Sequence, residues 1–182
     1  YQRAYLRLWL KPVVSRRMPR SEVRANFDRL AGKLVEKISE VPAELRNTKI
    51  LVEPIRGLED SSRYWSLNGV LEHVLIVSQG LETIILMLAA GKRPPIEVDI
   101  AKVKPKHRAG DLLEEFQAYA PKLYDRLDAA LAQPGMDLDS RLTHRHPWFG
   151  DLTARQWYWL ISSHVGVHYA QAKAIIAGLP WP

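Results

Sequence analysis

The sequence contains no cysteine among its 182 residues. This absence excludes disulfide bonds, thiolate metal ligands and a cysteine nucleophile. Long apolar runs are also absent, because the longest one, residues 84–90, is far too short to span a bilayer. We therefore expect a cytoplasmic protein without a membrane partner.

Acidic residues are missing from the first 20 positions, where all of the charged residues are basic: Arg3, Arg7, Lys11, Arg16, Arg17 and Arg20. The rest of the chain balances its charges, so this segment accounts for the whole net charge of +6. We expect a basic N-terminal arm over residues 1–18 and one domain over residues 19–182. The arm is a solvated extension, or it serves as a targeting segment, a nucleic-acid contact or a partner-docking strap. Nucleic acid is not the partner we expect for the domain, whose charges are balanced.

The first half of the domain contains two segments with apolar residues at spacings of three and four, which predict amphipathic helices. The first helix should start near Ser21, and its apolar face comprises Val23, Phe27, Leu30, Leu34, Val35 and Ile38. The second should begin near Ser62 or Ser66 and end near Ala90, because Gly91 can terminate a helix and the prolines at 94 and 95 forbid its continuation.

Two more helices are predicted in the second half. The third should start near Gly110 and continue to Leu131, with a kink or a break at Pro121. The fourth should run from Ala154 to Ala177, after an N-cap at Thr153. No segment alternates with period two for long enough to predict a strand. The expected fold class is therefore all-α, a four-helix bundle with long connecting loops.

Two histidines, His164 and His168, lie one turn apart in the predicted fourth helix. They share its apolar face, which also contains Trp157, Leu160, Ile161, Gln171, Ala172 and Ile175. A buried imidazole without a hydrogen-bond partner costs about 1–3 kcal/mol. Two imidazoles at this spacing can instead bind one metal ion.

A third ligand has to come from another helix, and His73 is the only histidine in the second one. It falls on the same face as Val70 and Val77, so it can point inward. We therefore predict a metal site made of His73, His164 and His168. His144 and His146, just before the fourth helix, are interpreted as structural, and His107 as solvated.

The stretches WSLNGVLEHV and HPWFGDLTARQWYWLISSHVGVHYAQ resemble the DinB/YfiT-like superfamily of helical-bundle proteins over about residues 19–178. That family pattern places one histidine in the second helix and an HxxxH motif in the fourth. The resemblance implies an up-down-down-up topology and a divalent metal, nickel or zinc, on three histidines. It also implies a link to transferases that use a low-molecular-weight thiol.

Three protein ligands with an open position are typical of a catalytic metal. Because the chain supplies no thiol, an attacking sulfur would have to arrive with a co-substrate. The resulting hypothesis is a metal-dependent transferase or hydrolase that activates a small thiol or water against an electrophilic small-molecule substrate. A homodimer is the assembly that we expect. The alternatives are a bundle that binds a metal or small ligand without turnover, and an interaction protein that uses its basic arm.

Overall fold

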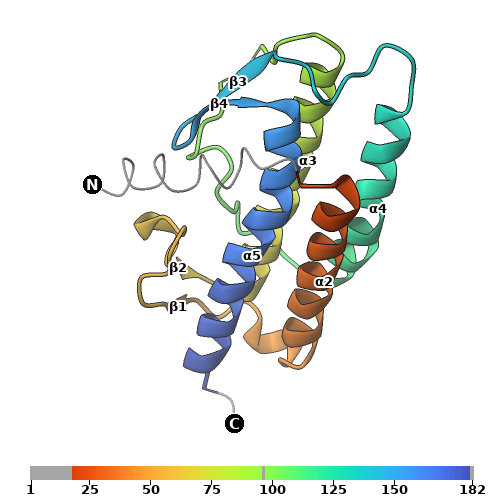
Figure 1. The fold of residues 1–182 in the computed structure, drawn as a ribbon. Coiled ribbons are helices and arrows are strands. Elements are labelled where there is room, and N and C mark those ends of the chain that lie inside the picture. Colours follow the sequence, from red (N-terminus) through yellow and green to blue (C-terminus); the bar gives the residue numbers. More distant parts are fainter. Residues whose placement is uncertain (1–17, 96, 181–182) are drawn as a thin grey trace.

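The computed structural model describes residues 18–95 and 97–180, so all of the predicted arm except Met18 lies outside the described residues. Within these ranges, four long helices dominate: α2 (Arg20–Ser39), α3 (Leu67–Ala89), α4 (Leu113–Leu131) and α5 (Ala154–Gly178). Figure 1 shows them packed side by side as a bundle. The prediction of a mainly helical domain is confirmed, and the boundary after residue 18 stays a prediction.

The direction of the helices follows from contacts at the two ends of the bundle. The Leu112 N–H, just before α4, donates to Asn68 Oδ1 in the first turn of α3 at 3.3 Å. At the other end, the Asp137 N–H donates to the Ala89 carbonyl at 2.8 Å. Helices α3 and α4 therefore start at the same end, and the chain between them returns along the bundle, as the green segment of Figure 1 shows.

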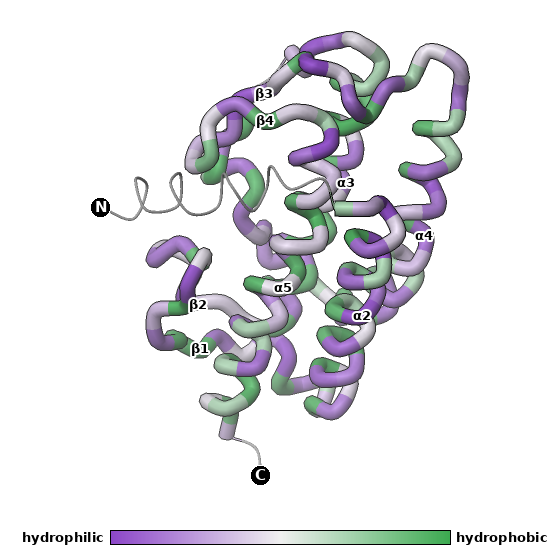
Figure 2. The backbone as a smooth tube through the Cα atoms, viewed as in Figure 1, coloured by the Kyte–Doolittle hydropathy of each residue, from purple (hydrophilic) through white to green (hydrophobic). Residues whose placement is uncertain are grey.

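The core lies where α5 packs against α2 and α3. Helix α2 buries Val23, Phe27, Ala31, Leu34 and Ile38, which repeat at spacings of three and four. Its tube in Figure 2 accordingly alternates between hydrophobic and hydrophilic colours. Burial of such a stripe is the main force that holds an amphipathic helix in a bundle.

The ends of α3 agree with two of the predicted signals. Ser66 caps its start, since the Ser66 side-chain oxygen accepts a hydrogen bond from the Gly69 N–H at 3.0 Å. At its other end Gly91 adopts a φ of 73°, and the Lys92 N–H reaches back to the Met87 carbonyl at 2.8 Å. This left-handed termination requires the conformational freedom of glycine.

Helix α4 begins at Leu113, slightly later than expected near Gly110. Of the two alternatives predicted at Pro121, a kink or a break, the break does not occur, because the helix continues through this residue. Proline has no N–H to donate, so the carbonyl of Gln117 loses its helical partner there. Packing of the buried face, which includes Phe116 and Leu123, keeps the helix continuous across this gap.

Short strands are present where none was predicted. Strand β1 (Ile50–Leu51) pairs with β2 (Tyr64–Trp65), and β3 (Thr143–His146) pairs with β4 (Gly150–Thr153), both antiparallel. The prediction of no strand was wrong here for a physical reason. Strand β3 reads Thr-His-Arg-His, which offers no alternation of apolar and polar residues to detect.

Helix α3 is long and apolar enough to cross a membrane by length and composition, and within the described residues it alone meets that test. Half of its most apolar window is nevertheless buried inside the molecule. Its sides pack against α4 and α5. These properties are those of the core helix of a bundle, which is apolar on most of its surface.

Candidate metal centre

The start of α5 fixes which of its residues face the core. The Thr153 N–H donates to Gln156 Oε1 at 2.9 Å, and the two residues form a reciprocal capping box. From this start, Trp157, Ile161 and His168 fall on the buried face at helical spacings. His164 lies on the same stripe and remains partly accessible.

The three histidines predicted as ligands come together in the structure. One ligand atom from each of His73, His164 and His168 can be chosen so that all lie within 4.8 Å of one another. His164 Nε2 lies 3.1 Å from His73 Nε2 and 3.1 Å from His168 Nε2. Helices α3 and α5 thus bring three ring nitrogens to one point, although the residues are far apart in the sequence.

Hydrogen bonds on the far side of two rings determine where their protons are. His73 Nδ1 lies 2.7 Å from the Val103 carbonyl oxygen, which can only accept. The Gln171 side-chain N–H donates to the Ser62 carbonyl at 2.7 Å, which leaves Gln171 Oε1 to accept from His168 Nδ1 at 2.8 Å. Both Nδ1 atoms therefore carry a proton, and both Nε2 atoms present a lone pair.

This arrangement fits a metal ion. Neutral His164 has at most one proton on Nε2, so at least one of its two contacts at 3.1 Å brings two lone pairs together. Neighbouring nitrogens that bind one Zn²⁺ at about 2.0–2.1 Å lie about 2.8–3.4 Å apart, from octahedral to tetrahedral geometry. A shared cation would turn this unfavourable contact into a favourable one, and the carbonyl partners of Nδ1 are the outer contacts typical of metal-bound histidines.

The surroundings also keep the three rings neutral, as ligation requires. Burial lowers the pKa of His73 to about 4, against the opposing effects of the Val103 hydrogen bond and of Glu59. Burial and the charge of His73 lower the pKa of His168 to about 3. Burial also lowers the pKa of His164 well below its usual value, and His168, His73 and His146 act in the same direction.

Among Trp65, Trp157 and Tyr169, which are near the three histidines in the sequence, only Trp65 has a ring contact with them in the described residues. The Trp65 ring, from β2, stacks on His168 with centroids 5.9 Å apart and lies 4.9 Å from His73. Trp157 instead contacts the rings of His144 and His146. Tyr169 faces Lys173.

The residues interpreted as structural or solvated have the following positions. His146 Nδ1 accepts hydrogen bonds from two backbone N–H groups of its own hairpin, those of Trp148 and Phe149. His107 is exposed, with a φ of 58°. Glu72, next to His73, accepts a hydrogen bond from the His107 N–H at 2.8 Å and so faces away from the ligand group.

Sequence reasoning missed two carbonyl groups at the site, those of Ser62 and Val103. Backbone atoms carry no sequence signal, and both belong to loops whose paths depend on the tertiary fold. Gln171 was placed on the same helix face as His168 but was given no role, although its spacing of three residues from His168 brings the two side chains together. That spacing was the available signal for its role.

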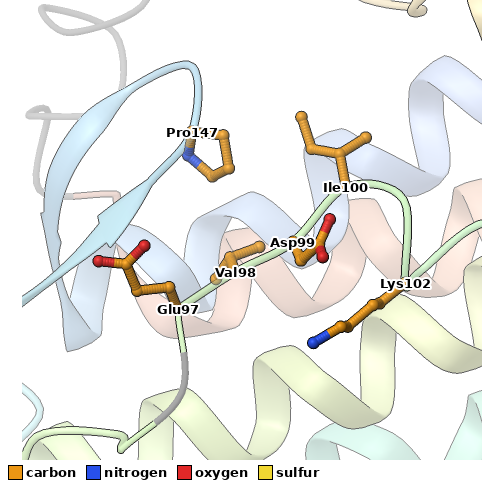
Figure 3. Close-up of a pocket in the computed structure, with 6 residues that line it drawn as sticks. All are labelled: Glu97, Val98, Asp99, Ile100, Lys102 and Pro147. Carbon is orange, nitrogen blue, oxygen red and sulfur yellow. The ribbon is translucent and has the colours of Figure 1, made fainter.

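Two surface pockets lie outside the histidine group. One, of about 510 Å³, lies between residues 97–102 and the turn of the β3–β4 hairpin, where Pro147 faces Val98 and Ile100 (Figure 3). The other, of about 350 Å³, lies near the start of α3 and is lined in part by Lys49, Glu72 and Arg108. The ligand atoms of the three histidines define the candidate centre.

The fold and the site together define a helical bundle with a buried three-histidine group that could hold a metal ion. The sequence model of the DinB superfamily matches residues 21–172, which include all four helices except the ends of α2 and α5. The chain therefore belongs to the DinB superfamily. Searches of curated proteins and of solved structures gave no match.

Proposed function

We propose that the chain is a metal-dependent enzyme in which His73, His164 and His168 bind a divalent cation, nickel or zinc. The observation that carries this proposal is the pair of 3.1 Å separations from His164 Nε2 to the Nε2 atoms of His73 and His168, whose Nδ1 atoms are already hydrogen-bonded. The up-down-down-up topology belongs to the same proposal. It is supported by the shared starting end of α3 and α4.

When bound, such a cation lowers the pKa of a coordinated water or thiol and polarises a carbonyl group of a substrate. The chain contributes orientation through the Val103 carbonyl and Gln171, and partial exclusion of water through Trp65. It contributes no nucleophilic sulfur. The proposed reaction is therefore attack by a low-molecular-weight thiol, or by water, on an electrophilic small molecule.

The metal site is tested by elemental analysis of protein purified without chelators and without a histidine-rich tag. We expect about one divalent ion per wild-type chain and a loss of most of it in His164→Ala and His168→Ala. His107→Ala is the matched control, because this histidine is exposed and lies outside the ligand group, and it should retain the metal. Equal metal content in all four proteins would refute the site.

Turnover is tested with the metal-loaded protein and a panel of small thiols paired with electrophiles. We expect thiol consumption that disappears in His164→Ala. Metal binding without consumption of any thiol and without hydrolysis would favour the alternative of a non-catalytic metal-binding bundle.

A further inference from the structure

The β3–β4 hairpin places another histidine close to the metal centre. The His146 ring lies over the first turns of α5, with its centroid 5.3 Å from that of Trp157. Trp157 and His164 are seven residues apart, which is two turns along one face of the helix. His146 is also near enough to His164 to act on it electrostatically. These three side chains therefore share one neighbourhood beside the ligand group.

The proton of His146 can be located from its contacts. Its Nδ1 accepts hydrogen bonds from the backbone N–H groups of Trp148 at 3.1 Å and Phe149 at 3.3 Å. A ring nitrogen that accepts carries no proton, so the proton of the neutral ring is on Nε2. Among residues 18–95 and 97–180, no acceptor is hydrogen-bonded to this Nε2–H.

Two further N–H groups nearby also lack acceptors. Trp157 is fully buried, and its indole Nε1–H has no partner among the described residues. His164 Nδ1 is buried without a partner in the same part of the chain, and it carries the proton when Nε2 binds a metal. Buried donors without acceptors are rare in folded proteins because each is costly. Two such buried donors, beside the unpartnered Nε2–H of the half-buried His146, indicate that an acceptor arrives from outside the chain.

We propose that His146, Trp157 and His164 form a carboxylate-binding subsite beside the metal centre, which selects substrates that carry a carboxylate group. A carboxylate offers two oxygens and about four lone pairs and has no proton to donate, which matches a set of donors alone. Its hydrogen bonds are stronger than those of a neutral carbonyl. The subsite rests on the proposed function, because the bound cation fixes the proton on His164 and supplies the balancing positive charge.

The test is calorimetric titration of the zinc-loaded protein with propionate, with propionamide as the uncharged probe. Trp157→Phe removes one donor and keeps an aromatic ring. His146→Asn keeps an acceptor for the two backbone N–H groups and removes the distal N–H. Each variant should bind propionate roughly 10-fold to 100-fold more weakly than wild type. Trp159→Phe, a partly buried residue of the same helix outside the subsite, should bind propionate like wild type.

Metal content, measured on the same samples, separates the two proposals. Full zinc occupancy with equal propionate affinity in wild type, Trp157→Phe and His146→Asn would overturn the subsite and leave the metal site intact. Propionamide binding as tightly as propionate would overturn it as well. A wild-type protein that takes up no zinc would overturn the metal site and, with it, the subsite. Thermal denaturation of each variant verifies that it is folded.

Discussion

At the scale of single residues, the candidate centre depends on side chains that would not themselves touch a metal. Gln171 is fully buried, and its amide links the Ser62 carbonyl to His168 Nδ1. The Ser62 carbonyl accepts from the amide N–H and so fixes the orientation of the Gln171 side chain. The amide oxygen then accepts from His168 Nδ1, which keeps the proton on Nδ1. His168 Nε2 is therefore free to bind a cation. Groups in this outer position tune ligand orientation and affinity.

Gln171→Leu should therefore weaken metal binding about 10-fold to 100-fold. The substitution removes the acceptor for the His168 N–H, so the ring is no longer held in its ligating tautomer. Competition with a chelating dye measures the affinity. Gln171→Glu, which keeps an acceptor, should lose less, and Gln117→Leu on the exposed face of α4 should lose nothing. Wild-type affinity in Gln171→Leu would show that the amide does not orient the ligand.

At the same scale, the sequence was sufficient to nominate His73, His164 and His168, because helical spacing placed them on buried faces and the family pattern matched them. It was insufficient for the donors of the proposed subsite. His146 lies before a proline in a segment with no periodicity, and only the hairpin brings it against Trp157. Contacts of this kind depend on the path of a loop, which local residue types do not determine.

At the scale of elements, α4 lacks one helical hydrogen bond, and a single substitution at Pro121 can restore it. Pro121 is exposed, so its ring fills no core position, and its missing N–H leaves the Gln117 carbonyl without a helical partner. Pro121→Ala should raise the free energy of unfolding by about 1–2 kcal/mol. The helix gains the bond, and the greater freedom of the unfolded chain offsets part of the gain.

Urea denaturation with matched slopes measures this change. Pro95→Ala, an exposed substitution in the connection after α3, is the control and should give no comparable gain. A loss of stability in Pro121→Ala would mean that the helix depends on the bend a proline introduces.

The helices were predictable because their apolar residues recur over four or more turns, and start signals such as Ser66 and Thr153 stand at their ends. The hairpins were not, because two-residue and four-residue strands are shorter than any reliable periodicity. Pro147 and Gly150, which has a φ of 77° at the start of β4, were the local turn signals in that segment. Their meaning became clear only from the pairing of His146 with Gly150.

At the scale of the whole molecule, the candidate centre joins parts that no single element could bring together. Helices α3 and α5 supply the rings, while the segments before α3 and before α4 supply the Ser62 and Val103 carbonyls. The side chain of Lys104 connects these two segments by donating to Ser61 Oγ at 2.8 Å. The formation of the site is therefore coupled to the folding of the whole bundle.

This coupling predicts a stability that falls in acid when the metal is absent. His73 and His146 have pKa values lowered to about 4, mainly by burial, and that of His168 is lowered to about 3. In the unfolded chain these histidines have a pKa of about 6.5, so they become protonated below that pH. In the folded chain they stay neutral until a lower pH. Unfolding is therefore favoured as the pH falls. Each such histidine should cost about 2 kcal/mol at pH 5.

Thermal denaturation of chelator-treated and zinc-loaded protein between pH 8 and pH 4 measures this effect. The melting temperature of the metal-free protein should be constant above about pH 7 and should decrease steadily below about pH 6.5. Zinc should raise it most near neutral pH, and the increment should shrink in acid as protons compete for the ring nitrogens. His107→Asn, which alters an exposed ring, should leave both profiles unchanged. If the melting temperature of the metal-free protein did not change from pH 7 to pH 5, the histidine rings would have to be hydrated in solution. Ring nitrogens that contact water would then not need a cation, which would contradict the metal site.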